Sequence, residues 1–539
     1  MTSKSIFIGK KIIVYWFIYA IISFLNWIVS FVVFILRGRK GKVVPPVKNP
    51  LLMKSATTLA EEIREGKLKS EDVVEAYIDR ILEVDPYINA TVERCFEVAL
   101  KEAREADSLV DSGKYTKEQL AETKPLLGIP VTIKCVLRVK GLSCTAASNL
   151  FLNEIAPEDA ATVAAMKKAG AIVIATSNVP EFAMDLETTN KVYGTTSNPY
   201  DTNRTCGGSS GGESALISAG ASVLGIGNDL VGSLRVPAHF TGIFAHKGTR
   251  GLVSNDGSVP PTRFDSEPFK HDTLKYVHTG PMCRYAEDLI TSMRILCQNE
   301  TVKATFGKKV DFSKLKICYM TNTRSYLALS VEEEIIAGLK RAVCYFEKNY
   351  NIKAKEIQMP SLLDANRCVA NRLLFSAKDK NITDVLTCGR GLNFDVKLDF
   401  VKYFFGMSTL SLMPLIVFNF GYLPFWNRKD LVPYFDSMVQ KWITELESHL
   451  DDDTVLLMPT FPVTAPYKST ILCLFPSVFY NAIFNITGLP STQCPIGFDE
   501  QGLPYGIQIA GCKNNDALTI ACAVELEKAF GGWKSPGTV

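Results

Sequence analysis

An unbroken apolar run lies near the N-terminus. Residues 12–36, IIVYWFIYAIISFLNWIVSFVVFIL, contain no charged side chain. A helix of that length would extend roughly 37 Å at about 1.5 Å per residue, which exceeds a bilayer hydrocarbon core of about 30 Å. The run is too long for a signal-peptide core, and no small-residue cleavage site follows it. We therefore expect residues 1–11 to form a tail and residues 12–36 a single transmembrane helix.

The flanks of this run suggest an orientation without fixing it. Basic residues are slightly more numerous after the run than before it, which favours a cytoplasmic location for the domain that follows. Sequons at Asn89, Asn381 and Asn485 arise often by chance and leave the side of the membrane open. Residues 37–50 are predicted to be a linker, because the prolines in VVPPVKNP resist helix and sheet.

Beyond the linker, helical and strand patterns alternate. From Ser55 to Val84 the apolar positions recur three and four residues apart, which predicts helix, with Ser70 as a plausible helix start. A charged, helix-favouring stretch covers residues 93–122. Residues 130–136 and 171–176 are predicted to be buried strands, and residues 162–170 a helix that ends at a glycine. This alternation predicts an α/β fold for residues 51–539.

A second apolar stretch covers residues 400–426. Lys402, Pro414, Asn419, Gly421 and Pro424 interrupt it. A second membrane span is one interpretation. The interruptions favour a core helix or an apolar lid that dips into the membrane surface.

Composition excludes several classes of protein. With 59 basic and 56 acidic residues, the net charge of +3 gives no nucleic-acid-binding footprint. The 14 cysteines form no CxxC pair and none has zinc-ligand spacing to histidine, so we expect no metal site. Most of the cysteines are expected to be small buried apolar residues.

The densest chemical signal is residues 206–237, CGGSSGGESALISAGASVLGIGNDLVGSLRVP. Glycines on both sides of Ser209 and Ser210 permit close backbone approach to a ligand. A flexible Gly/Ser linker is a weaker interpretation, because a helical pattern follows directly. A phosphate-binding loop is also weaker, because the Lys-Ser/Thr ending of a P-loop is absent from the segment. Residues 207–211 also match the G-x-S-x-G of a nucleophile elbow. An elbow needs a strand before it, but residues 198–205 are predicted to be a polar loop, and no histidine has a persuasive setting.

This segment resembles the amidase signature family. In that family, GGSSGG is followed 24 residues later by the serine of a D-I-G-G-S-x-R-x-P stretch, as in residues 229–237, DLVGSLRVP. The family's lysine lies in a G-x-P-x-x-x-K segment, which residues 128–134, GIPVTIK, match. The resemblance extends from about Leu51 to the C-terminus. It implies a large mixed β-sheet surrounded by helices.

The resemblance also implies roles for three side chains. Ser233 would attack the amide, Ser209 would relay the proton on a cis peptide bond, and Lys134 would be the base and then the acid. Lysine must be neutral to act as a base, and burial favours the neutral form. Lys134 lies in an apolar run that suits burial, although a lysine at a strand end can also reach solvent. This chemistry needs no cofactor.

The resemblance places further residues around the nucleophile. The oxyanion hole would consist of backbone N–H groups of Leu230, Val231, Gly232 and Ser233. Ser210 would be a structural hydroxyl. Asp229 and Arg235 are expected to form a structural ion pair rather than to take part in catalysis.

Three positions depart from the family pattern. Val231 replaces a glycine and would be strained if that position required a positive φ. Asn228 replaces a small hydroxyl residue before the aspartate, and Gly248 replaces a proline after Lys247. A catalytically impaired, lipid-binding relative is therefore an alternative to an active enzyme.

The membrane span and the second apolar stretch together suggest a substrate taken from the bilayer. Long-chain fatty-acid amides fit both features, and the resemblance implies the same class. A smaller amide, such as an arylacetamide, stays open. Subunits of tRNA-dependent amidotransferases share the signature, but a membrane anchor argues against that role. Homodimer formation is left open.

Overall fold

The computed structural model describes residues 40–259, 275–323, 328–374, 394–420 and 431–538, with short pieces and single residues elsewhere. Within the predicted span, residues 12–36, it describes only Phe24, Ile28, Phe31, Val32 and Ile35, all of them helical. The tail, residues 1–11, and most of the span lie outside the described residues. Among the residues that are described, no helix is both long and apolar enough to cross a bilayer.

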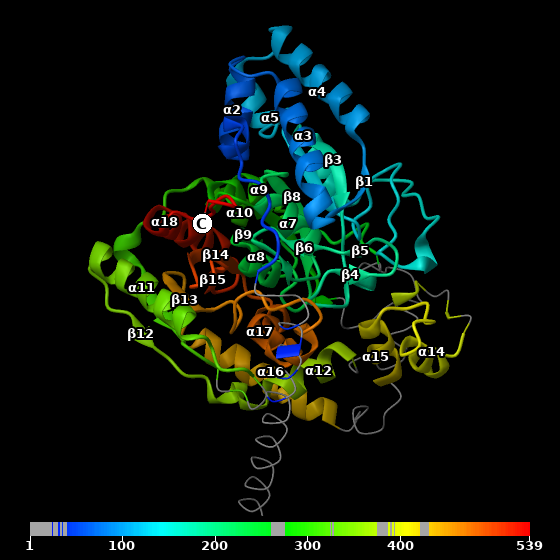
Figure 1. Ribbon diagram of the computed structural model, residues 1–539. Coiled ribbons are helices and arrows are strands. Elements are labelled where there is room, and N and C mark those ends of the chain that lie inside the picture. The colour runs from blue at the N-terminus through cyan, green and yellow to red at the C-terminus, as the bar shows by residue number, and fades with distance from the viewer. Residues whose placement is uncertain are drawn as a thin grey trace, which may run out of the picture.

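The described part of the chain is centred on one mixed sheet of 11 strands, which confirms the predicted α/β class (Figure 1). Strands β2, β3 and β8 run parallel to one another, as do β11, β12 and β13, and the other neighbours are antiparallel. In spatial order the strands are β1 (Thr91–Arg94), β3 (Ile172–Ser177), β2 (Pro130–Lys134), β8 (Leu224–Asp229), β10 (His278–Cys283), β9 (Phe244–Lys247), β14 (Ser491–Phe498), β15 (Pro504–Gly511), β13 (Thr454–Pro459), β11 (Lys316–Tyr319) and β12 (Lys355–Glu356).

The helical region predicted from Ser55 to Val84 consists of two helices, α2 (Ala56–Arg64) and α3 (Ser70–Ile88). The break follows from Gly66, whose φ of +70° ends a helix at little cost. The stretch 93–122 likewise divides into α4 (Phe96–Asp111) and α5 (Lys117–Thr123), after strand β1. The predicted strands and the intervening helix, α6 (Ala161–Lys168), are confirmed within two residues at each end.

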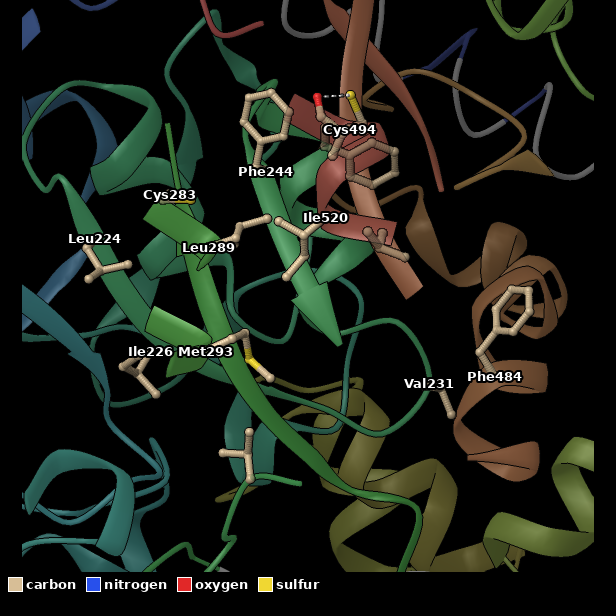
Figure 2. Packing of buried hydrophobic residues seen from close by; sticks show 14 of the residues in the cluster. Leu224, Ile226, Val231, Phe244, Cys283, Leu289, Met293, Phe484, Cys494 and Ile520 are labelled. Carbon is tan, nitrogen blue, oxygen red and sulfur yellow. Dashed lines mark hydrogen bonds between the residues drawn. The ribbon is translucent and has the colours of Figure 1, made fainter. Parts of the chain in front are cut away.

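Some of the remaining helices pack on the sheet, and others pack mainly on one another. Helices α7 and α8 contact each other and the central strands, as do α9 and α18. Figure 2 shows part of the continuous apolar core between sheet and helices. The remaining helices in the described residues are α7 (Gly211–Ser218), α8 (Arg235–Thr241), α9 (Glu287–Leu296), α10 (Glu300–Lys303), α11 (Glu333–Tyr350), α12 (Ala365–Leu374), α14 (Val396–Tyr403), α15 (Leu412–Phe420), α16 (Val432–Glu447), α17 (Phe479–Thr487) and α18 (Asp516–Phe530).

The segment predicted to be a polar loop, residues 198–205, is instead a small hairpin. Strands β6 (Ser197–Asn198) and β7 (Asp201–Thr205) pair with each other, and β4 (Thr189–Asn190) pairs with β5 (Gly194–Thr195) nearby. The polar composition of residues 198–205 did not predict strand pairing, because the hydrogen bonds between the two strands are made by backbone groups. The Asn198 amide adds bonds to the Thr205 and Phe240 carbonyls.

The end of the predicted linker packs on the rest of the chain. In the predicted linker, residues 37–50, the structure describes residues 40–50: residues 40–49 contain no helix or strand, whereas Pro50 begins a 3-10 helix (Pro50–Met53). Val44 is nevertheless buried, and the Val47 N–H donates to the Ser535 hydroxyl at 2.9 Å. The end of this linker is therefore held against the C-terminal residues of the chain.

The second apolar stretch, residues 400–426, contains two short helices in its described part. Helix α14 packs on α15, and neither has the length of a span. The end of α14 leaves large apolar side chains in solvent: Phe404 and Phe405 are each 71% exposed and Met407 is 63% exposed. Residues 421–426 lie outside the described residues.

Candidate active site

Parallel strands β2 and β8 end at the same edge of the sheet. Lys134 is the last residue of β2, and Asn228 and Asp229 end β8. Ser209 and Ser210 come directly before α7, which packs on both strands. The loop of residues 230–234 then leads from β8 into α8. Three segments that are distant in sequence therefore meet at one edge.

Lys134 is fully buried and does not reach solvent. Its Nζ donates to the Ser209 hydroxyl at 2.8 Å, to Asn228 Oδ1 at 2.6 Å and to the Asn228 carbonyl at 3.4 Å. Burial lowers the pKa of Lys134 from 10.5 to about 7, against weaker opposing contributions from Cys135, Asp229 and Glu213. A substantial fraction of this amine is therefore neutral near pH 7, as a base requires. The Gly208–Ser209 peptide bond is cis, as the resemblance implied.

Ser233 lies beside the glycine-serine loop. The Ser210 N–H donates to the Ser233 carbonyl at 3.1 Å, and the Ser233 side chain is almost fully covered. The structure joins Lys134 to Ser209, but within the described residues it records no hydrogen bond from Ser209 to the Ser233 hydroxyl. Catalytic hydrogen bonds of this kind often tighten only when substrate is bound.

Ser210 has the structural contact expected of it, because its hydroxyl donates to the Asn228 carbonyl at 3.3 Å. The oxyanion-hole role of residues 230–233 stays a prediction. The Gly232 N–H donates to Asp229 Oδ1 at 2.7 Å, so this donor is occupied. The N–H groups of Leu230, Val231 and Ser233 form no hydrogen bond within the described part of the chain.

Val231 is not strained. The positive φ of this loop lies at Gly232, at +121°, and Val231 does not share it. The valine side chain is buried in the core, and Figure 2 shows it next to the helix that carries Phe484. At Gly248, an added Cβ would lie 3.3 Å from Asp516 Oδ1, a close contact that a small shift relieves. Neither departure distorts the site.

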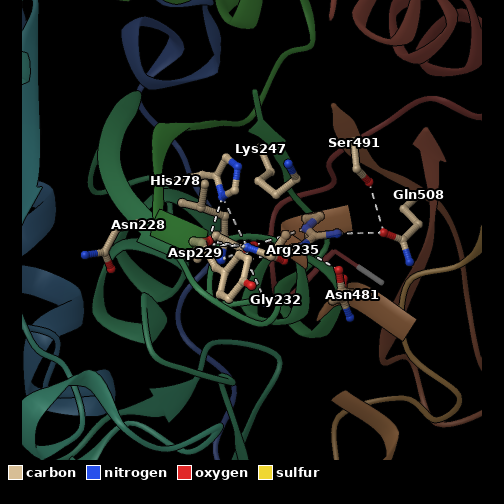
Figure 3. Close-up of polar contacts among 12 residues, drawn as sticks. Asn228, Asp229, Gly232, Arg235, Lys247, His278, Asn481, Ser491 and Gln508 are labelled. Atoms are coloured by element: carbon tan, nitrogen blue, oxygen red, sulfur yellow. Dashed lines mark hydrogen bonds and ion pairs between the residues drawn. The ribbon is translucent and has the colours of Figure 1, made fainter. Parts of the chain in front are cut away.

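The expected ion pair between Asp229 and Arg235 is present, and both side chains are fully buried (Figure 3). Burial alone would raise the pKa of Asp229, but the Arg235 charge and the hydrogen bonds lower it overall. Arg235 also donates to Asn485 Oδ1 at 2.6 Å and to Gln508 Oε1 at 3.0 Å.

Sequence reasoning missed Asn485 and Gln508 as parts of this network. The sequence pattern marks Asn485 only as a sequon, yet its side chain is fully buried and its amide donates to both the Asp229 carbonyl and Oδ1. Folding therefore removes this sequon from the surface. No pattern links these residues to position 229, since more than 250 positions separate each from it.

The described histidines do not support a Ser-His hydrolase. His239 contacts the Gly506 and Val463 carbonyls, His246 contacts Asp516, and His278 contacts the Tyr276 carbonyl. Among the described histidines, none is hydrogen-bonded to Ser209; His271 lies outside those residues. No group of three His, Cys, Asp or Glu in the described ranges is arranged to hold a metal ion.

Known proteins match this chain over nearly its whole length. The Amidase family model matches residues 72–520. Fatty-acid amide hydrolase 2-A of Danio rerio is 37% identical over 500 residues, covering 92% of both chains. Fatty-acid amide hydrolase 2 of Homo sapiens is 34% identical and covers 97% of this chain and 98% of its own.

A solved structure described as fatty acid amide hydrolase superposes with a TM-score of 0.70 at 21% identity, covering 90% of this chain and 86% of that chain. A likeness at that identity shows the shared fold alone. Since the family model covers most of the chain and the relatives exceed 30% identity, the chain belongs to the amidase signature family.

Proposed function

We propose that this protein is a membrane-anchored serine amidase that hydrolyses fatty-acid amides to a free fatty acid and an amine or ammonia. The observation that carries the proposal is the buried Lys134 amine 2.8 Å from the Ser209 hydroxyl, in a chain with fatty-acid amide hydrolase 2 relatives.

In the proposed reaction, the Ser233 oxygen attacks the amide carbonyl carbon. Its proton passes to Ser209 as the Ser209 proton passes to Lys134. The N–H groups of Leu230, Val231 and Ser233, which have no acceptor in the described structure, are available to the oxyanion. Lys134 then returns its proton through Ser209 to the leaving nitrogen, and the C–N bond breaks. Water, activated along the same route, releases the fatty acid.

Two features support a membrane location. The first is the uncharged run of residues 12–36. The second is the exposed apolar surface at the end of α14, formed by Leu398, Val401, Phe404, Phe405 and Met407. Such a surface, with Lys397 and Lys402 on the same short helix, fits contact with the bilayer interface. A homodimer would leave the chemistry unchanged, because all the named site residues come from one chain.

The test is turnover of a long-chain acyl amide by the purified full-length protein and by its Ser233→Ala variant. We expect hydrolysis by the wild type alone, together with fluorophosphonate labelling that Ser233→Ala abolishes. Equal turnover by both would eliminate Ser233 as nucleophile. Faster turnover of an arylacetamide than of the acyl amide would instead indicate a small-amide enzyme. Lipid binding without labelling would indicate an inactive relative.

A further inference from the structure

Asn228 contacts Lys134 twice. The side-chain Oδ1 lies 2.6 Å from Nζ and the main-chain carbonyl lies 3.4 Å from it. The shorter contact is well within hydrogen-bonding range, whereas the main-chain contact is long. These two oxygens and the Ser209 hydroxyl are the hydrogen-bond partners of Nζ in the described structure.

The number of hydrogens on the neutral amine determines which of these three neighbours its lone pair can face. A neutral lysine amine carries two hydrogens and one lone pair, and a carbonyl oxygen can only accept a hydrogen bond. If both hydrogens bind the two Asn228 oxygens, the lone pair is left facing the third neighbour, Ser209. When the amine is protonated, its third hydrogen occupies that direction and donates to Ser209. The same arrangement therefore serves both protonation states.

We infer that Asn228 is a positioning residue, whose two carbonyl oxygens hold the hydrogens of neutral Lys134 and so direct its lone pair at the Ser209 hydroxyl. This inference rests on the proposed function and adds a residue to its machinery. The amide is suited to the task because it is uncharged. A carboxylate at the same place would also accept both hydrogens, but it would stabilise the ammonium form and remove the base.

The amide orientation follows from the same contact. Asn228 is partly buried, and Oδ1 rather than Nδ2 must face a protonated Lys134, since an ammonium group has no acceptor. The other titratable groups acting on Lys134 are Cys135, Asp229 and Glu213. Substitutions at Asn228 leave these three residues unchanged. A change in the pH profile of activity is therefore caused by the substitution at Asn228.

The experiment measures kcat, KM and the pH dependence of kcat/KM for wild type, Asn228→Ala and Asn228→Asp on a long-chain acyl amide. For Asn228→Ala we expect kcat to fall on the order of tenfold to a hundredfold with KM unchanged, because the base loses its orientation. Asn228→Asp keeps the shape and adds a charge, so we expect the acid limb to move upward by about 1–3 pH units, with activity recovering at high pH.

Asn49→Asp is the matched control. Asn49 is exposed, and its side-chain oxygen accepts the Leu51 N–H, which aspartate also does. We expect wild-type kinetics from it. If wild type is active and Ser233→Ala is not, but Asn228→Asp keeps the wild-type pH profile, this inference fails and the proposed function stands. If Ser233→Ala retains turnover, the proposed function itself fails.

Discussion

The guanidinium of Arg235 forms a two-point ion pair with the carboxylate of Asp229, with Nη2–Oδ1 at 3.0 Å and Nε–Oδ2 at 3.1 Å. The same carboxylate accepts the N–H groups of Gly232 and Leu234, on either side of Ser233. One buried pair therefore fixes both ends of the turn that presents the proposed nucleophile. Its Arg235 side is held in turn by Asn485 and Gln508 from the C-terminal part of the chain, and Figure 3 shows the contact with Gln508.

Removing one partner of this pair should be costly. Arg235→Met leaves the Asp229 carboxylate buried without its counter-charge, and we expect the free energy of unfolding to fall by about 3–5 kcal/mol. Chemical denaturation followed by tryptophan fluorescence measures this change. The exposed pair Lys316–Asp451 provides the control, since Lys316→Met should cause no resolvable loss. Equal effects of the two substitutions would contradict the role given to the buried pair.

Activity should depend on the protonation of Lys134. Burial lowers its pKa to about 7, so the neutral base is depleted as pH falls through that value. We expect kcat/KM to rise about tenfold per pH unit below pH 7 and to level off above it. A profile that stays flat from pH 5 to pH 9 would be incompatible with Lys134 as the base.

The same pKa shift affects stability. Between about pH 7 and pH 10.5 the unfolded chain binds a proton at Lys134 that the folded chain does not. The contribution of Lys134 to the free energy of unfolding therefore becomes more favourable to the folded state as pH rises across that window. The difference in unfolding free energy between wild type and Lys134→Met should therefore change in favour of wild type over this range. Denaturation series at pH 7, 8.5 and 10 measure it, and a constant difference would contradict the shift.

Gly212 should not tolerate a side chain. An added Cβ would lie 2.4 Å from the Asn178 N and 2.5 Å from the Asn178 O. Gly212→Ala should displace the start of α7, destabilise the fold by about 1–3 kcal/mol and reduce Ser233 labelling by fluorophosphonate. Gly307→Ala is the control, because nothing lies within 4 Å of its added Cβ. Wild-type labelling of Gly212→Ala would show that this close approach is not required.

Restoring glycine at position 231 should not improve the enzyme. Val231 has an ordinary φ and a buried side chain, so Val231→Gly removes packing and adds backbone freedom. We expect a loss of about 2 kcal/mol in unfolding free energy and no gain in kcat. A marked increase in kcat would instead show that valine impairs the oxyanion hole.

The exposed apolar side chains of α14 should affect KM only for a substrate that is presented in a lipid bilayer. Replacing Phe404 and Phe405 with serine should raise KM for a long-chain amide presented in phosphatidylcholine vesicles and leave KM for a water-soluble anilide unchanged. Tyr115→Ser is the control, since Tyr115 is 51% exposed in the connection between α4 and α5, and Figure 1 shows these two helices far from α14. Equal changes for both substrates would argue against bilayer contact at α14.

Reading along the chain was enough to predict the α/β class and the principal strands β2 and β3, and motifs shared with a known family located the three segments that carry Lys134, Ser209 and Ser233. These features are local, because periodicity and motif spacing are visible along the chain. It could not determine that Asn228 binds Lys134, that Gly232 rather than Val231 carries the positive φ, or that Asn485 and Gln508 support Arg235. These contacts follow from the folded arrangement, because each joins segments that lie far apart in the sequence and meet only when the strands of one sheet pair and its helices pack.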